Sequence, residues 1–318
     1  MAFAIAMALL ASPLVRAAGG GGPLGNFGPT GVEFTIQRDL TMEVSAVQAG
    51  SPAEGKLEKG QVIRAINGKK LPAGPLEQAK LLSDLITGAE AGDGVLTFSL
   101  DAKEVAIAVP VLGSFSKTWP VDCDKSRKII RTHADYLGRL AKDKGLHAHN
   151  MSHGLAILAL LSTGEDGDLE VVRGIYRQRM KGFKGPDTGS HSWHNGYQGM
   201  AVCEYYLRTG DETVMPLINA ICESARKWQV HGGWTHWAKG VNPQYTGGGL
   251  MNPAGTNLLT TLLLAQHCGA KVDEGTLQRA LVYFYRFAGH GSNPYGDHRP
   301  EGGYGSNNGK TEMLAMAM

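Results

Sequence analysis

The sequence carries no excess of charge of either sign. Over 318 residues, 31 Lys and Arg stand against 29 Asp and Glu, which gives a formal net charge of +2. Proteins that bind nucleic acids or anionic membranes by electrostatics concentrate positive charge on one face or in one segment. We therefore expect neither a nucleic-acid partner nor a polybasic membrane-binding site.

Cysteine is scarce too. The chain has four such residues, Cys123, Cys203, Cys222 and Cys268. Their spacing matches no zinc-binding pattern, so they predict no metal site, and we expect no cofactor. Two alternatives stay open for the thiols: Cys203 and Cys222 meet across a helical hairpin, or all four are buried and free.

No apolar run in the sequence is long enough to span a bilayer comfortably. The run from Phe3 to Val15 instead has the length of a signal-peptide core, and the small residues Ala17 and Ala18 offer a cleavage point. We interpret residues 1–18 as a signal peptide and the glycine-rich residues 19–27 as a flexible leader. The sequence therefore predicts export to the periplasm or the extracellular space, with no membrane span.

Residues 28–112 predict a small α+β domain. Val32, Phe34 and Ile36 alternate with polar residues, as in a strand with one buried face. A helix is predicted over Pro75 to Ile86, with an apolar face formed by Leu76, Ala79, Leu82 and Leu85. Further strands are predicted around Val44 to Val47, at Gly60 to Ile66 before an Asn-Gly turn, at Val95 to Leu100 and at Val105 to Val111.

Three motifs in this region carry a family resemblance. The turn Ala49-Gly50-Ser51-Pro52-Ala53, the strand Gly60 to Ile66 and the turn Asn67-Gly68 together resemble the core signature of bacterial PDZ domains. Gln61 departs from the pattern, because that family usually has Asp there. The Asp stabilises a turn, so its loss leaves the expected fold unchanged.

The resemblance implies a peptide-binding edge. In PDZ domains an extended peptide adds beside a strand, and amides of the preceding glycine-rich loop receive its terminal carboxylate. The matching residues here are Gly28, Thr30, Gly31, Val32, Glu33 and Phe34. Pro29 removes one amide donor from this loop, which weakens carboxylate capture. The alternative is a PDZ-shaped module that packs against its own neighbour domain.

After a linker at residues 113–123, residues 124–318 change to helical periodicity and repeat. Asn150, Asn195, Asn252 and Asn308 each begin a helical segment, at intervals of 45, 57 and 56 residues. Helix pairs at such a period predict a solenoid or a closed toroid. Gly154 and Gly199 each follow an Asn by four residues, where they allow close helix packing.

A Gly-Gly-aromatic element precedes two of these helices, at Gly232-Gly233-Trp234 and Gly302-Gly303-Tyr304. It resembles the repeats of the terpenoid cyclase and protein prenyltransferase superfamily, which form α/α toroids. Most of the chain is also similar to a family of uncharacterised exported bacterial proteins that join a PDZ domain to such a toroid. These resemblances imply a fold but no reaction. Since the chain stops at Met318, early in a helix, we expect the toroid to be truncated at the carboxyl terminus.

Nine of the eleven histidines fall near the starts of these helices, which a toroid gathers at one rim. A metal is one interpretation, because His149 and His153 lie four residues apart, but no third ligand is identifiable. Acid–base catalysis on a glycan is another, since imidazoles, Asn and aromatic rings suit sugars, and Trp193 and Trp234 are expected at the same rim. The third is structural, with Asn and His as helix caps. The candidate catalytic residues are His149, His153, His194, Tyr197, His236 and Asp297.

Two functions remain open from sequence alone. The first is a binding or scaffold role, with a peptide or protein ligand at the PDZ groove. The alternative is a carbohydrate-active enzyme, either a polysaccharide lyase or a glycoside hydrolase, with a glycan at the toroid rim. Hydrolysis requires paired carboxylates, for which the rim loops offer Asp187, Asp297 and Glu301.

Overall fold

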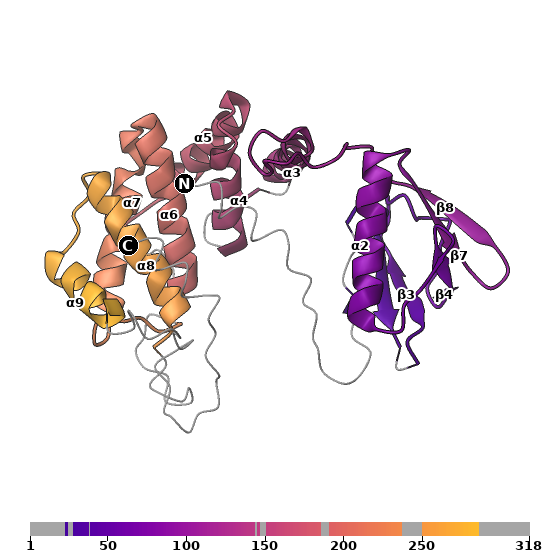
Figure 1. Cartoon of the computed structure of the whole chain (residues 1–318). Coiled ribbons are helices and arrows are strands. Elements are labelled where there is room, and N and C mark those ends of the chain that lie inside the picture. Colours follow the sequence, from indigo (N-terminus) through magenta and orange to yellow (C-terminus); the bar gives the residue numbers. More distant parts are fainter. Residues whose placement is uncertain are drawn as a thin grey trace, which may run out of the picture. The chain divides into compact units, whose positions relative to one another are not determined.

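A computed structural model describes residues 23–24, 28–37, 39–143, 145–146, 151–185, 191–236 and 250–285. The chain divides into two compact units, residues 1–132 and residues 133–318 (Figure 1). Within the described residues, every β-strand lies in the first unit and the second unit is helical. None of the helices among these residues is long and apolar enough to cross a membrane.

The first unit contains two small antiparallel sheets. One has the strand order β1-β2-β3-β4, and the other has the order β6-β5-β7-β8. The strands are β1 (Pro23–Leu24), β2 (Val32–Ile36), β3 (Met42–Val47), β4 (Val62–Ile63), β5 (Ala65–Ile66), β6 (Lys69–Lys70), β7 (Val95–Ser99) and β8 (Glu104–Ala108). The predicted alternation in β2 is confirmed, because Val32, Phe34 and Ile36 are buried whereas Glu33 is exposed.

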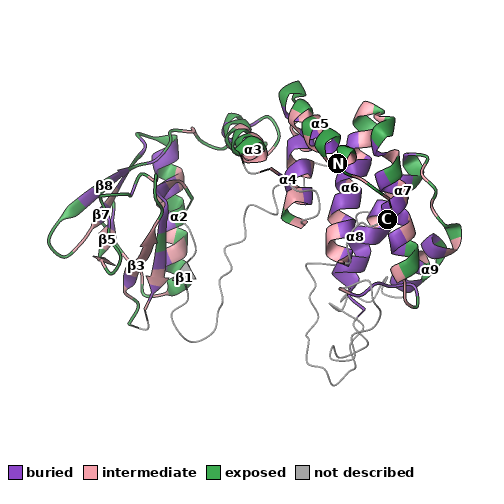
Figure 2. Ribbon diagram, turned by 180° about the vertical axis from the view of Figure 1, so that it is seen from behind, coloured by how far each residue is buried: buried purple, intermediate pink, exposed green. Residues whose placement is uncertain are grey.

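Helix α2 (Pro75–Ala91) packs against β7, and its buried face (Figure 2) agrees with the predicted one except at Leu76. Leu82 is buried and Ala79 and Leu85 pack half-buried against the core as expected, but Leu76 is 70% exposed. The buried face also includes Gln78, Ile86 and Ala89. Gln78 is buried because its side-chain amide donates to the carbonyl oxygens of Leu40 and Pro72. Gln78, a hydrogen-bonded polar residue, is thus buried in the core, whereas Leu76, which the apolar pattern predicted to be buried, is exposed.

The segment after β8 is fastened to the end of α2. The amides of Leu112 and Gly113 both donate to the carbonyl oxygen of Glu90. The Glu90 carboxylate lies 2.7 Å from Nζ of Lys125, whose side chain is 1% exposed. Lys125 also lies over the ring of Phe115, with Nζ 4.5 Å from the centroid. A buried ion pair therefore holds the start of helix α3 against the first unit.

The second unit is built from helices that follow one another along the chain. They are α3 (Asp124–Asp143), which begins in the first unit, α4 (Met151–Ser162), α5 (Asp166–Lys181), α6 (Ser192–Thr209), the short η2 (Glu212–Val214), α7 (Met215–Trp228), α8 (Asn252–His267) and α9 (Glu274–Tyr285). The predicted helices at Asp124 to Lys142, after Asn150 and at Met251-Asn252 are confirmed. The helix predicted to open at His194 is also present, but it begins two residues earlier, at Ser192.

Helix α6 lies between α4 and α8, so every second helix from α4 to α8 belongs to one row (Figure 1). Two contacts fix the direction of α8 relative to α6. Thr261 Oγ1 donates to the carbonyl oxygen of Gly196, and Cys268 Sγ donates to that of Cys203. Both partners advance by seven residues between the two contacts, so α6 and α8 run parallel.

Glycines bring the backbones of this row together. A Cβ on Gly196 would lie 2.5 Å from Cβ of Asn257, and a Cβ on Gly199 would overlap the side chain of Thr261. A Cβ on Gly154 of α4 would lie 3.0 Å from the backbone of Tyr197 on α6. The prediction that the repeated glycines permit close packing is therefore confirmed.

Candidate functional site

The loop before β2, where peptide binding was predicted, is a single 3-10 turn at Gly28–Thr30, designated η1. The amide of Gly31 donates to the Gly28 carbonyl at 3.2 Å, and the amide of Val32 donates to Thr30 Oγ1 at 3.3 Å. Pro29 has no amide hydrogen. The amides of Gly31 and Val32 therefore form hydrogen bonds within the loop, and they do not point at a terminal carboxylate.

The outer edge of β2 is occupied by the chain itself. Strand β1 pairs with it antiparallel, with Pro23 opposite Thr35 and Leu24 opposite Phe34. The other edge of β2 pairs with β3 over its whole length. Strand β1, which has two residues and precedes the η1 loop, thus pairs with the edge of β2. This is the edge to which an extended peptide would add.

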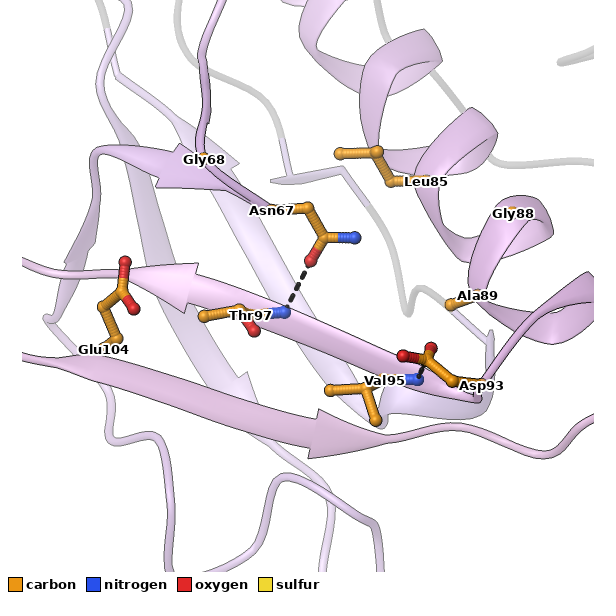
Figure 3. A pocket seen from close by; sticks show the side chains of 9 residues that line it. All are labelled: Asn67, Gly68, Leu85, Gly88, Ala89, Asp93, Val95, Thr97 and Glu104. Atoms are coloured by element: carbon orange, nitrogen blue, oxygen red, sulfur yellow. Dashed lines mark hydrogen bonds between the residues drawn. The ribbon is translucent and has the colours of Figure 1, made fainter.

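Two open hollows lie on the first unit. The smaller, of about 210 Å³, lies between η1 and the turn at Gln48–Pro52. The larger, of about 490 Å³, lies between the second half of α2 and β7 (Figure 3). Two of its polar groups, seen in Figure 3, bond to the backbone of β7: Asn67 Oδ1 accepts from the Thr97 amide at 2.7 Å, and Asp93 accepts from the Val95 amide at 3.0 Å. These groups stabilise turns.

Among the described residues of the second unit, three imidazoles and an indole form a cluster at the start of α6. We call it the imidazole cluster, and its members are His191, Trp193, His194 and His236. The rings of His191 and His194 stack with centroids 4.5 Å apart, and the His236 ring lies 6.1 Å from that of His191. The cluster joins the amino terminus of α6 to the loop that precedes α8.

Local structure explains how His236 reaches this place. Trp234 is fully buried, and its indole nitrogen donates to the Ala225 carbonyl at 2.8 Å. Thr235 then forms an isolated bridge with Leu250, and the carbonyl of His236 accepts from the Ser192 amide at 2.9 Å. The buried indole therefore anchors the loop, and the backbone bond aligns it with the first residue of α6.

The surroundings of the cluster favour the neutral form of its imidazoles. Burial lowers the pKa of His194 and of His236, and burial together with the neighbouring rings of His194 and His236 lowers the pKa of His191. Trp193 Nε1 donates to His236 Nδ1 at 2.7 Å. Because an indole nitrogen only donates, Nδ1 of His236 is an acceptor and its proton lies on Nε2.

The structure unites some of the predicted residues and separates others. His194 and His236 belong to the cluster, whereas His153 lies half-buried on α4 and Tyr197 faces Gly154 of α4. Sequence reasoning also placed Trp234 at a ligand-binding rim, and this is wrong, because Trp234 lies in the core. His149 and Asp297 lie outside the described residues. Across the described ranges, no three His, Cys, Asp or Glu side chains are arranged to hold a metal.

The interpretation of Asn as a helix cap is wrong for two repeats. The cap positions of α6 and α8 are His191 and Met251, and neither makes a side-chain capping bond. Asn195 lies inside α6, where its amide nitrogen donates to the His191 carbonyl at 3.2 Å. Asn252 Oδ1 accepts from the Tyr283 hydroxyl at 2.9 Å. The Asn252 side chain therefore joins neighbouring helices α8 and α9.

Comparison with known proteins assigns the helical part to a family. The model of a family described as a domain of unknown function (DUF6288) matches residues 126–318, more than half of the chain. The chain therefore belongs to this family. No curated protein and no solved structure matches it.

Proposed function

We propose that the first unit is a PDZ-like domain that binds an extended peptide by strand addition, and that the chain is an exported adaptor. The order of elements supports this: a pair of long antiparallel strands, a turn-rich segment, short strands, helix α2 and a closing hairpin. The residues behind the resemblance lie at turns that require them. Gly60, Asn67 and Gly68 have φ of 89°, 48° and 70°.

One observation carries the binding role: the outer edge of β2 accepts an antiparallel strand from β1. Backbone hydrogen bonds give strand addition its affinity, and pockets for alternate side chains give it specificity. Strand β1 supplies only two residues, so a longer peptide gains more backbone bonds at the same edge. The ligand thus replaces β1.

The loop geometry favours an internal peptide segment over a free carboxyl terminus. Carboxylate capture requires several amides that point to one anion. Here Pro29 offers none, and the amides of Gly31 and Val32 bond within the loop. The proposed ligand is therefore an extended segment, with its affinity independent of a terminal charge.

The test uses peptides selected on the full-length chain from a displayed random library, with affinities measured by calorimetry. Methylation of alternate backbone nitrogens of the best peptide should abolish binding, because it removes the strand's donors. Amidation of its carboxyl terminus should leave binding unchanged. A peptide that tolerates backbone methylation in both registers would refute strand addition, and one that needs its free carboxylate would refute the internal-segment assignment.

The second unit supports an α/α-toroid assignment in the same proposal. Helices α4, α6 and α8 form a row of neighbours, and α5 and α7 return the chain between them. Parallel neighbours joined by returning helices are what a helical-hairpin repeat generates. Small-angle scattering of the complete protein would test closure, since a closed ring is more compact than an open solenoid of the same length.

A second candidate function is glycan binding or proton transfer at the imidazole cluster. Neutral imidazoles both donate and accept hydrogen bonds, and Trp193 offers a ring face for a sugar. Full-length chain would be screened against neutral and uronate-containing polysaccharides for binding and for release of unsaturated products. His194→Ala should abolish either signal, whereas His267→Ala, at an exposed histidine of α8, should not. A chain that binds and cleaves none of these glycans would exclude this candidate.

A further inference from the structure

Two thiols from helices far apart in sequence lie together inside the second unit. Cys203 is in the middle of α6, and Cys268 directly follows α8. Cys268 Sγ lies 3.7 Å from the carbonyl oxygen of Cys203, and the two thiols share a hydrogen bond. Both thiols are free in this structure, and both residues are buried.

The helix pair that carries these thiols is held unusually close. Gly196 and Gly199 of α6 face Asn257 and Thr261 of α8 with no room for a Cβ. A disulfide requires Cα atoms about 4.4 to 6.8 Å apart, so it can join only helices that pack closely. The thiol pair lies two turns further along this same seam, since Thr261 contacts Gly196 and Cys268 contacts Cys203 at the same sequence separation of 65.

A third thiol offers a competing partner. Cys222 is buried on α7, and the sequence alone allowed it to pair with Cys203. Its pKa is raised by burial and by the neighbouring Cys268. The direct contact, however, joins Cys268 to Cys203.

We propose that Cys203 and Cys268 form a disulfide when the protein meets a thiol oxidant of the disulfide class. The thiolate of one residue attacks the oxidant's S–S bond, forms a mixed disulfide and releases one thiol. The second residue, deprotonated, attacks the protein sulfur of that mixed disulfide and releases the other thiol. Two protein thiols and one small disulfide become one protein disulfide and two small thiols.

The two residues differ in a way that orders the steps. Cys268 lies at the end of its helix, and its hydrogen bond from Cys203 lowers its pKa. Burial and the same bond raise the pKa of Cys203. Cys268 is therefore the attacking thiolate and Cys203 resolves the mixed disulfide.

The cross-link would tie the middle of α6 to the end of α8 and so fix one repeat against the next. A link across a loop of this length restricts the unfolded chain strongly. The inference does not depend on peptide binding by the first unit or on the chemistry of the imidazole cluster, because neither involves these thiols.

The test incubates full-length chain in reduced and oxidised glutathione, then counts free thiols and maps linked peptides by mass spectrometry without reduction. We expect two of the four thiols to be lost and the peptides of Cys203 and Cys268 to be joined. Oxidation should raise Tm by roughly 5 °C or more, an effect reversed by reductant.

The matched control is the double variant C123S/C222S, which keeps only the proposed pair and should oxidise like the wild type. The variant C268S should lose the cross-link and the reductant-sensitive rise in Tm. A link between Cys203 and Cys222 would overturn the proposal. Four free thiols in the wild type and two in the double variant after full equilibration would overturn it as well.

Discussion

Trp193 Nε1 lies 2.7 Å from Nδ1 of His236, which is 43 residues further along the chain. This bond exists only while Nδ1 is unprotonated, so it adds to the burial that lowers the pKa of His236. Trp193→Phe should therefore raise the pKa of His236, as measured by NMR titration of its ring protons. Trp119→Phe, at an exposed indole of the first unit, is the control. An unchanged His236 titration in Trp193→Phe would contradict the assigned tautomer.

Stability should fall in mild acid because of the same cluster. His191, His194 and His236 have pKa values below the unfolded value of about 6.5. Below that pH the unfolded chain binds protons that the folded chain excludes, so unfolding is favoured as pH falls towards the lowered folded pKa values. Urea unfolding at pH 7.5 and pH 5.5 measures this loss. Replacing the three histidines by glutamine should flatten the dependence between these two pH values, and an equally steep loss would point to other groups.

The glycines of the α6–α8 seam should be irreplaceable. Gly199→Ala places a methyl group into Thr261, and we expect a loss of about 1–3 kcal/mol in the free energy of unfolding. Gly174→Ala, in α5, meets no atom within 4 Å and should stabilise by about 0.5–1 kcal/mol through helix propensity. Urea denaturation of both variants gives the comparison. A neutral Gly199→Ala would mean that the two helices separate freely.

The buried pair of Glu90 and Lys125 should behave as a unit. Lys125→Met leaves the Glu90 carboxylate, 11% exposed, without its counter-charge, and should cost about 3 kcal/mol of stability. Adding Glu90→Gln should recover much of that loss, because the uncompensated charge is then gone. A double-mutant cycle in urea measures the coupling. Additive losses would show that the two side chains act independently.

Removal of β1 should increase peptide affinity. Deleting residues 1–24 frees the outer edge of β2, and affinity should rise roughly tenfold if the open edge is about one-tenth populated in the full chain. Deletion of residues 1–21, which keeps β1, is the matched control and should change nothing. Equal affinity of the two truncated chains would mean that β1 does not compete with the peptide. It would contradict the proposal that the peptide binds at the outer edge of β2.

The imidazole cluster was predictable only in part. The histidine-rich helix starts signalled His194 and His236, and both are in the cluster. Its other two members, His191 and Trp193, lie near the same helix start in the sequence but were not among the candidate catalytic residues. Trp234 gave the opposite error, since an aromatic residue after two glycines suggested a binding rim. Its indole instead bonds to Ala225 in the core. A sequence shows which residue types lie near a helix end. It does not show which of those residues are buried by the neighbouring loop.

The sequence by itself determined the local conformations of this protein. Alternation of apolar and polar residues predicted β2, and helical periodicity predicted α3, α4, α6 and α8. The glycine positions predicted the close packing of the helix row. These features depend on neighbours within a few residues, which the order of side chains encodes directly.

Only the tertiary structure decided which of these elements meet. It placed β1 on β2, turned Gln78 rather than Leu76 into the core, and set Cys268 instead of Cys222 against Cys203. Such contacts join residues separated by up to 65 positions. They depend on which surfaces pack most closely, and many pairings of the same amphipathic elements satisfy one sequence pattern until packing selects among them.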